Sequence, residues 1–396
     1  MIIKSKTKTD ADILQKTVLI LGAGVGGLIT ANVLSQSIGK NHRIILIDKE
    51  RQFKFSPSFP WLATGVRKPD KICKDLNTLK KKGINIVEGE IAEINGENKT
   101  VQVNGKIYSG DYMVVAMGAD LVPDSIKGLE GIGHNFYSLE GAENLRDSLK
   151  GFQGGDLTVL ITSLPYKCPA APYEMAMLLE YDCRKRKIRD KVNISLYAAE
   201  PGPMGVAGKD LSGAVRQMVV SKGIRYFPNH QLESVNSEEK TLHFSNGNVA
   251  HTDLLAYVPT HKVPDVVKGA GLTGESGWIP VDRNTLETQF ENVFAIGDVT
   301  GIPLALGKPL PKAGVFAHYQ AEVVAHNIAV DILGSGKRKA FTGDGECFIE
   351  LGDGKAGFAR GNFYHEPLPE VKMYKPGVHW HAGKVLFEKD WFRRWF

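Results

Sequence analysis

A glycine-rich turn near the start of the chain carries the clearest chemical signal in the sequence. An apolar, β-branched stretch runs into the sequence GAGVGG, from Gly22 to Gly27, and then into a helical pattern. Gly22 permits a tight turn, Gly24 lets a pyrophosphate approach the backbone, and Gly27 allows helix and strand to pack closely. A second apolar strand ends at Asp48, where an acid can bind ribose hydroxyls. This context favours a dinucleotide site over an unrelated glycine turn.

The turn of a second strand–turn–helix unit has a different composition. It runs from Ser163 to Glu174 through Cys168, contains no glycine, and includes Pro165 and Pro169. A pyrophosphate could hardly approach such a backbone. The second unit is therefore predicted to be built like a nicotinamide domain without binding the nicotinamide dinucleotide.

Four cysteines offer thiol chemistry, but their spacing alone assigns none of it. Cys73, Cys168, Cys183 and Cys347 are too few and too scattered for a disulfide framework or a CxxC metal site, and no metal site is predicted. Cys73 and Cys183 fall in predicted amphipathic helices and are interpreted as structural. For Cys168 and Cys347, the alternative to a chemical role is that they are small apolar side chains buried in the core.

The elements that position these residues alternate between strands and helices. Strands are predicted at 17–21, 43–47, 112–118, 157–162 and 193–197, and helices at 75–82, 173–187 and 314–333. A β-meander is predicted from the stretches 84–88, 99–103 and 106–108. The stretch 285–298 is predicted to return to the first fold, with a strand whose end presents Gly297 and Asp298.

This order predicts an α/β protein with two Rossmann-like, three-layer ββα-type dinucleotide-binding domains. The predicted divisions are a polar N-terminal extension (1–16), the first part of the first domain (17–150), the second domain (151–275), the second part of the first domain (276–335) and a small C-terminal region (336–396). The C-terminal region is predicted to end in an amphipathic membrane anchor.

Composition narrows the classes of function. A chain of 396 residues with 42% hydrophobic residues can fill two or three cores. The net charge of +5 is mild and its Lys and Arg residues are mostly scattered, so nucleic acid is not implied. No apolar run reaches the roughly 18 residues of a membrane helix, and the polar start is unlike a signal peptide.

The last 17 positions combine aromatic rings with cations. They hold Trp380, Phe387, Trp391, Phe392, Trp395 and Phe396 together with Lys384, Lys389, Arg393 and Arg394. This composition is typical of an interfacial anchor and predicts a peripheral, monotopic association with a membrane surface. The sequence does not indicate which side of the membrane is bound. The alternative is a helix that packs on the protein's own core, for which more aliphatic residues and fewer cations are expected.

Several motifs together resemble a known family. The turn from Gly22, the strand end at Met117-Gly118, and Phe294-Ala-Ile-Gly-Asp298 resemble the flavoprotein superfamily with two dinucleotide folds, over nearly the whole chain. Within it, four stretches resemble sulfide:quinone oxidoreductase: CPAAPYE at 168–174, PKAGVFA at 311–317, ECF at 346–348 and KVLFEKDWF at 384–392. Type II NADH dehydrogenase and the flavoprotein of flavocytochrome c sulfide dehydrogenase are related families.

The resemblance implies FAD in the first domain. Asp48 is expected on the adenosine ribose and Asp298 on the ribityl chain, with Gly118 and Gly297 also at the cofactor. Lys312, at the start of a predicted helix, is expected to stabilise charge on the reduced ring; the alternative is a solvated lysine. A third cysteine, which the family often has near residues 118–128, is absent here, so the length of the sulfur product and covalent attachment of FAD stay open.

The resemblance also implies a redox pair formed by Cys168 and Cys347 on one side of the flavin. Hydrosulfide would attack their oxidised bridge, leaving a persulfide and a thiolate, and two electrons would pass through the flavin to a quinone. We expect the dipole of the following helix to lower the pKa of Cys168. Glu174 is the candidate acid/base.

The family pattern also implies site roles for two phenylalanines and a histidine. Phe348 and Phe387 are candidates for quinone binding. His134 matches a family histidine, although a single histidine is as well explained as an ordinary surface or core residue. A second family histidine is absent from the loop 200–208.

The leading hypothesis is sulfide oxidation with a membrane quinone, such as ubiquinone or menaquinone, as acceptor. A flavocytochrome-type sulfide dehydrogenase, a type II NADH:quinone oxidoreductase and a persulfide-binding flavoprotein without turnover are the alternatives. The glycine-free second turn and the cysteine pair argue against NADH. A homo-oligomer is compatible with the sequence, which leaves the oligomeric state open.

Overall fold

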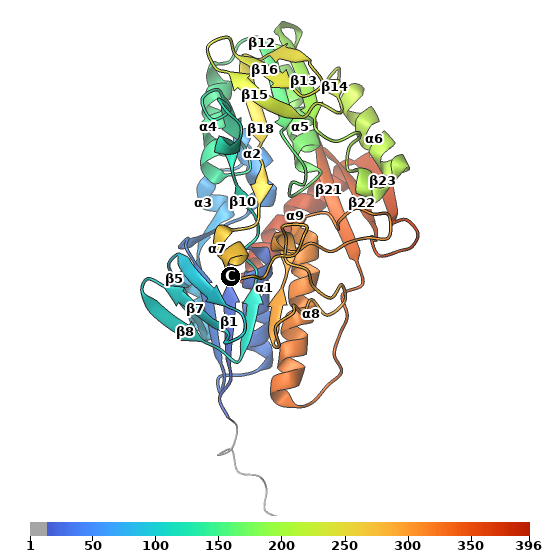
Figure 1. The fold of residues 1–396 in the computed structure, drawn as a ribbon. Coiled ribbons are helices and arrows are strands. Elements are labelled where there is room, and N and C mark those ends of the chain that lie inside the picture. Colours follow the sequence, from blue (N-terminus) through green and yellow to red (C-terminus); the bar gives the residue numbers. More distant parts are fainter. Residues whose placement is uncertain (1–13) are drawn as a thin grey trace, which may run out of the picture.

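Two parallel five-stranded sheets form the body of the chain in the computed structural model, which describes residues 14–396 (Figure 1). In the first sheet the order is β20 (Val293–Ala295), β9 (Tyr112–Val115), β1 (Thr17–Leu21), β2 (Arg43–Asp48) and β5 (Ile84–Glu88). In the second it is β11 (Gly133–Asn135), β18 (Leu254–Val258), β12 (Gly155–Ile161), β13 (Val192–Ala198) and β14 (Arg225–Phe227). Most of the predicted extension 1–16 lies outside the described residues.

Each sheet is covered by helices on one face and by a small antiparallel sheet on the other. Successive side chains of a strand point to opposite faces, and in β1 Val18 and Ile20 join the core under the helices while Leu19 and Leu21 join the other core. The first sheet packs on α1 (Val25–Ser37) and α8 (Gly314–Leu333), and on β6 (Ile91–Asn95), β7 (Thr100–Val103) and β8 (Lys106–Ser109). This layering is the predicted ββα arrangement.

The second unit repeats the pattern. Its helices are α4 (Leu139–Gly151), α5 (Ala171–Lys185) and α6 (Lys209–Val220), and its small sheet is β15 (Leu232–Asn236), β16 (Thr241–Phe244) and β17 (Val249–His251). Leu160 and Leu255 pack against the small sheet, whereas Val159 and Ala256 face the helical side. The predicted α/β fold class is confirmed, and α8 has the predicted bounds.

The chain passes from one unit to the other at positions that differ from the predicted boundaries. β11 pairs with β18, so the second sheet includes residues before the predicted boundary at 151. After β18, the helix α7 (Asp265–Gly269) already packs on β6 of the first unit, before the predicted return at 276. Between them β10 (Asp120–Leu121) pairs with β19 (His261–Lys262), which joins the two crossing segments.

Two local predictions were wrong. The stretch 84–88 is not part of the meander, because β5 continues the parallel sheet beside β2, and β6 takes its place in the meander. Cys73 is not helical: α3 (Pro69–Ile72) ends before it, and β4 (Cys73–Asp75) pairs with β3 (Gln52–Lys54). Both errors come from pairing partners that are distant in sequence and leave no local pattern.

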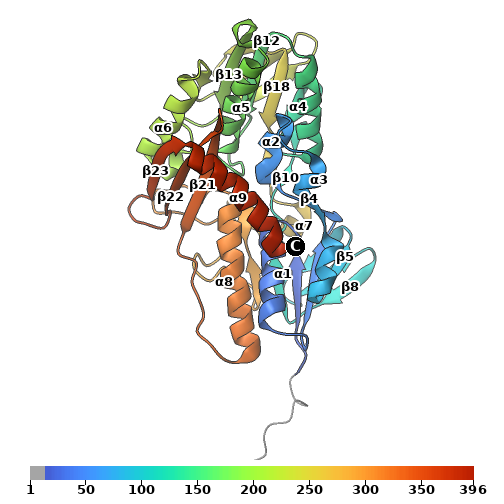
Figure 2. The same ribbon diagram turned by 180° about the vertical axis from the view of Figure 1, so that it is seen from behind.

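The C-terminal region consists of one antiparallel sheet and one long helix. Its strands are β21 (Asp344–Gly352), β22 (Lys355–Asn362) and β23 (Glu370–Gly377), followed by α9 (Val378–Trp395). Figure 2 shows α9, in red, running from this sheet toward α1. None of the described helices is long and apolar enough to cross a membrane.

Much of α9 packs on the protein's own core, which corrects part of the anchor prediction. Trp391 and Trp395 are only 3% and 2% exposed. The Trp391 ring stacks on Phe53, with ring centroids 4.8 Å apart, and Trp395 meets the edge of His318. Leu386 and Phe387, by contrast, are 64% and 43% exposed. Aromatic composition predicted an apolar face but could not tell a lipid partner from a protein partner.

The remaining elements are short helices. They are α2 (Phe59–Ala63) and the 3₁₀ turns at Ser56–Ser58, Leu76–Lys82, Pro123–Ser125, Arg189–Lys191, Gly205–Ala207 and Gly297–Val299. The short helix predicted at 75–82 is present as the 3₁₀ helix Leu76–Lys82, which carries the chain from β4 into β5.

Candidate active site

One large cavity collects most of the predicted site residues. It has a volume of about 2070 Å³ and lies where the strands of both sheets end. Its walls include Gly22, Gly24, Asp48, Gly118, Cys168, Glu174, Gly297, Asp298, Lys312, Cys347, Phe348 and Phe387. Gly27 and His134 are not among the lining residues.

The glycine turn has the shape that a dinucleotide needs. Gly22 has a φ of +94°, and a Cβ there would lie 2.5 Å from the carbonyl oxygen of Ala116. A Cβ on Gly24 would meet no atom within 4 Å, because this glycine faces the open cavity. A Cβ on Gly27 would overlap the carbonyl oxygen of Gly22. The turn, the open approach and the close helix–strand packing therefore fall on the three predicted glycines.

Two acids at strand ends line the same part of the cavity. One oxygen of Asp48 accepts the backbone N–H of Ala23 at 2.5 Å and the other accepts that of Glu50 at 2.8 Å. Oδ1 of Asp298 is buried and has no hydrogen-bond partner among the described residues, and burial raises the pKa of this carboxyl. An unpaired buried oxygen is costly unless a ligand pairs with it. The glycine turn, the Asp48 carboxylate and this oxygen of Asp298 fit a bound dinucleotide.

Cys168 sits on a turn held in an unusual conformation. Its φ is +52°, which costs free energy for any residue but glycine. Its N–H donates to the Lys312 carbonyl at 2.6 Å, and its carbonyl accepts the hydroxyl of Tyr137 at 3.1 Å. Contacts from two distant segments thus fix the backbone that carries the thiol.

Both predicted redox cysteines are free thiols in the cavity wall. Burial raises the pKa of Cys347 far above its usual range, and the nearby Cys168 raises it further. Burial, and then the charge of Glu174, raises the pKa of Cys168 to about 11. The N–H of Ala171, at the start of the following helix, does lower the Cys168 pKa, but burial outweighs it, so the predicted net lowering was wrong. A buried thiolate is costly here, which favours the protonated or the bridged form of the pair.

Glu174 is paired with a cation that was predicted to face a membrane. Lys384 of α9 places Nζ 2.5 Å from Oε1 of Glu174, and the two side chains are 8% and 5% exposed. Oε2 of Glu174 accepts the backbone N–H of Glu350 at 3.1 Å. Nζ of Lys384 also lies 4.6 Å from the centre of the Trp61 ring. The anchor prediction was wrong for Lys384, because a buried acid from α5 is its partner.

Further ionic contacts around this pair were missed. Both oxygens of the buried Glu350 lie 3.0 Å from Nδ1 of His381, and burial raises the pKa of Glu350. Nearer the C-terminus, the Arg67 guanidinium donates to both carboxylate oxygens of Glu388, at 2.7 to 3.1 Å. In the sequence, Glu350 could be noticed only as an acid three positions after Cys347. No periodic pattern or motif surrounds it.

Lys312 is buried rather than solvated. Its Nζ donates to the backbone carbonyls of Asp298 at 2.6 Å and Thr300 at 2.9 Å, and lies 3.3 Å from the centre of the Trp278 ring. Burial lowers the pKa of Lys312 to about 8. The alternative of an ordinary solvated lysine is therefore wrong, and the expected role toward a reduced ring stays a prediction.

His134 is not brought to the cysteines. It lies half-buried on β11, outside the cavity wall, and burial lowers its pKa. In the loop that lacks the second family histidine, Glu200 lines the cavity and accepts the hydroxyls of Tyr166, at 2.7 Å, and Tyr173. Sequence reasoning missed Glu200, whose only signal is its place just after β13.

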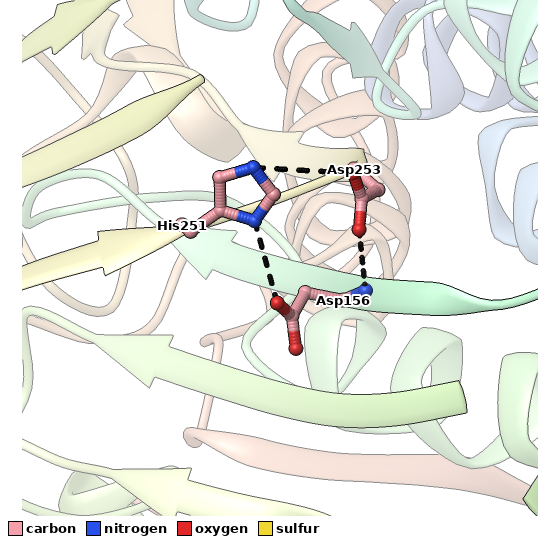
Figure 3. A group of neighbouring side chains, drawn as sticks. All are labelled: Asp156, His251 and Asp253. Atoms are coloured by element: carbon pink, nitrogen blue, oxygen red, sulfur yellow. Dashed lines mark hydrogen bonds and ion pairs between the residues drawn. The ribbon is translucent and has the colours of Figure 1, made fainter. Parts of the chain in front are cut away.

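A group of metal-type side chains lies outside the cavity wall. Asp156, His251 and Asp253 meet at the start of β12 and β18 (Figure 3). Nδ1 of His251 lies 3.3 Å from Asp156, and Asp253 accepts the backbone N–H of Asp156 at 2.8 Å. These contacts explain the group as a link between neighbouring strands.

The fold and cavity define an oxidoreductase with two dinucleotide-type domains. The family model described as pyridine nucleotide-disulphide oxidoreductase matches residues 16–321. The sulfide-quinone reductase of Aquifex aeolicus is 30% identical, over 94% of this chain and 90% of that protein. The mitochondrial sulfide:quinone oxidoreductase of Mus musculus is 26% identical, over 89% of this chain and 79% of that protein.

A solved structure agrees with these relatives. The crystal structure of the sulfide:quinone oxidoreductase from Aquifex aeolicus matches with a TM-score of 0.86 and 28% identity, covering 96% of this chain and 91% of that chain. The chain belongs to the sulfide:quinone oxidoreductase family and is an oxidoreductase of this flavin-dependent type. The resemblance predicted from sequence is confirmed.

We predict that the charges beside Cys168 set its reactivity. Glu174→Gln removes a charge that raises the Cys168 pKa and should increase its alkylation rate at pH 9 roughly three- to tenfold. Lys384→Gln removes a charge that lowers this pKa and should slow the reaction. Iodoacetamide labelling of the reduced protein, quantified on the Cys168 peptide, measures both. Lys389→Gln, an exposed lysine of α9, is the matched control. Equal rates in all four proteins would contradict the assignment.

Proposed function

We propose that this chain oxidises hydrogen sulfide to sulfane sulfur or polysulfide with FAD and passes two electrons to a membrane quinone. The observation that carries the proposal is that Cys168 and Cys347, far apart in sequence, both line one dinucleotide-sized cavity with Glu174, and that Cys168 and Glu174 both raise the pKa of Cys347. The names of the relatives from Aquifex aeolicus and Mus musculus support sulfide and quinone as the substrates.

FAD is the cofactor that the cavity residues fit. The open backbone at Gly24 would receive the pyrophosphate, Asp48 the adenosine ribose, and the unpaired oxygen of Asp298 the ribityl chain. Gly118 and Gly297, both with positive φ, bring backbone close to the same space. When bound, the flavin supplies a two-electron acceptor.

The cysteines carry the sulfur. Hydrosulfide attacks the oxidised Cys168–Cys347 bridge, the S–S bond breaks, and one cysteine becomes a persulfide while the other leaves as a thiolate. The persulfide and the thiolate then form a bridge longer by one sulfur atom, releasing one proton and two electrons, for which a bound flavin would be the acceptor. Burial raises the pKa of both thiols and so disfavours the free thiolate. Glu174, which is paired with Lys384, is the proposed acceptor of the proton.

The acceptor side is proposed at α9. Phe348 and Phe387 line the cavity with ring centroids 6.3 Å apart and are the proposed contacts of the quinone ring. Leu386 and Phe387 expose apolar surface on α9 beside the basic Lys389 and Arg393. This surface is the part of the predicted anchor that stays free to meet a membrane, from which a lipid-soluble quinone would enter.

We predict that Cys168→Ala and Cys347→Ala each abolish sulfide-dependent quinone reduction while the flavin stays bound. The two sulfurs act as one unit, so the double variant should be no worse than either single one. Cys73→Ala and Cys183→Ala are the controls and should stay close to the wild type. Steady-state quinone reduction measures the effect. If Cys347→Ala keeps more than about a tenth of the activity, a barrier change below about 1.4 kcal/mol, the bridge mechanism is wrong.

We predict that the double substitution Leu386→Ser and Phe387→Ser weakens binding to vesicles with anionic lipid at least about tenfold. Each buried apolar side chain contributes about 1.5 to 3 kcal/mol, and the basic residues add about 1 kcal/mol each near such a surface. Co-sedimentation with liposomes measures the binding. Leu333→Ser, which alters the equally exposed end of α8, should have no effect. Unchanged sedimentation of the double variant would place the membrane contact elsewhere.

A further inference from the structure

The strand β21 divides the cavity wall into two sides. Successive residues of a strand point to opposite faces of its sheet, and Cys347 and Phe348, which both line the cavity, are neighbours on β21. Phe348 points toward α9, where its ring centroid lies 6.3 Å from that of Phe387. Cys347 therefore points to the face of the sheet that is turned away from α9. The thiol and the proposed quinone contact lie on opposite faces of one strand.

The face that carries Cys347 is turned toward α6. Ala359 of β22 is paired with Cys347 and so lies on the same face. Gly357, two positions before Ala359, also lies on this face, and a Cβ there would be 3.8 Å from the Met218 side chain of α6. Cys347 and Ala359 line the cavity together with Leu211, near the start of α6. The cavity therefore extends from Cys347 to the loop that precedes α6.

Three lysines line this side of the cavity. They are Lys167, next to Cys168, Lys209, the first residue of α6, and Lys308, in the loop before α8. Within residues 14–396 their side chains make no ion pair and no hydrogen bond. Lys209 and Lys308 are exposed, so the cavity opens to water here. A Cβ on Gly205 would lie 3.8 Å from Nζ of Lys308, which places this ammonium against the loop before α6.

This opening is joined to the cysteine turn by a buried acid. Burial raises the pKa of Glu200, and the charge of Lys308 is one of the effects that oppose it, so the two groups lie close together. Glu200 accepts the hydroxyl of Tyr166 at 2.7 Å, and the same hydroxyl lies 3.4 Å from the carbonyl oxygen of Pro169, which follows Cys168. Tyr166 and Glu200 both line the cavity. The wall is thus continuous from Lys308 to Cys168.

The two sides of the cavity differ in the sign of their excess charge. Beside the loop that precedes α6, the three lysines face two acids, Glu200 and Glu275. Beside α9, apart from the Glu174–Lys384 pair, the wall holds three acids and one arginine: Glu322, Glu346, Glu388 and Arg394. Arg394 lies 3.7 Å from Glu322, so its charge is already paired. An anion is therefore favoured on the lysine side and disfavoured on the side of α9.

We propose that Lys209 and Lys308 form an entrance for anions, through which hydrosulfide reaches the two cysteines. Hydrosulfide is a small anion, and a cleft lined by charge of the opposite sign raises its local concentration and its rate of arrival. A quinone is neutral and apolar, so the lysines give it no advantage at this entrance. The inference rests on the proposed function and assigns its anionic substrate to one side of the cavity.

Alkylation by a charged and a neutral reagent tests the entrance without sulfide or turnover. Iodoacetate is an anion and iodoacetamide is its neutral analogue. The ratio of their rates at the Cys168 peptide of the reduced protein, at low ionic strength, measures the attraction for anions and cancels changes in the thiolate fraction. The double variant Lys209→Gln and Lys308→Gln should lower this ratio at least about threefold and leave the iodoacetamide rate within about twofold.

Three controls isolate the charge. The double variant Lys209→Arg and Lys308→Arg keeps both charges and should keep the wild-type ratio. Lys389→Gln removes an exposed lysine of α9 and should also leave the ratio unchanged. In about 1 M salt, where charges are screened beyond about 3 Å, the wild type and the double Gln variant should give the same ratio.

Steady-state kinetics at low ionic strength then test whether hydrosulfide uses this entrance. The double Gln variant should lower kcat/KM for sulfide at least about threefold, because fewer anions reach the cysteines. Its KM for a short-tailed quinone should stay within about twofold of the wild type, because the quinone is uncharged and is proposed to bind on the side of α9.

The outcomes distinguish the two claims. Wild-type flavin that sulfide fails to reduce would overturn the proposed function, while the labelling ratio would still decide whether anions enter here. An unchanged ratio in the double Gln variant would overturn the entrance alone. Equal slowing with both reagents, or the same loss in the double Arg variant, would show a change of structure and would also overturn it. A lower ratio with an unchanged kcat/KM for sulfide would overturn the assignment of hydrosulfide to this entrance.

Discussion

The rest of the site depends on one buried ion pair, between Glu174 on α5 and Lys384 on α9. Charges leave water at a high cost, and removing one partner of a buried pair leaves the other uncompensated. The pair therefore requires α9 to dock against the second unit, where the first turn of α5 follows the cysteine turn. Docking also brings β21, and with it Cys347, to the cavity. The position of the C-terminal helix and the surroundings of the two thiols therefore depend on the same ion pair.

Trp61 and the aromatic cluster near Phe53 extend this constraint into the first unit. Lys384 and Arg67 lie over the Trp61 ring, at 4.6 and 4.3 Å from its centre, and cations over aromatic faces are stabilising. Trp391 packs on Phe53 one turn beyond Glu388. The last helix therefore has two sides: a buried side that brings Lys384 to the cavity wall, and an exposed side at Leu386 and Phe387, which is the proposed contact with a membrane.

Local patterns made much of the fold predictable from the sequence. The glycine turn at Gly22, the strand ending at Asp48 and the bounds of α8 follow from spacing and periodicity, which survive in any tertiary context. The Lys384–Glu174 pair spans 210 positions, and no local rule distinguishes a buried lysine from a solvated one. The sign of the Cys168 pKa shift was mistaken for the same reason, because a helix terminus can be seen in the sequence and burial cannot. Glu350 and His381 carried no motif at all.

The central claim is that sulfide, and not NADH, is the electron donor of this flavoprotein. Anaerobic titration of the purified protein with each donor, followed by flavin absorbance and then by a quinone analogue, tests it most directly. The account predicts rapid bleaching by sulfide, recovery of colour on addition of quinone, and no rapid bleaching by NADH, because Pro165 and Pro169 occupy the second turn. Rapid bleaching by NADH, or flavin that sulfide leaves oxidised, would contradict the account.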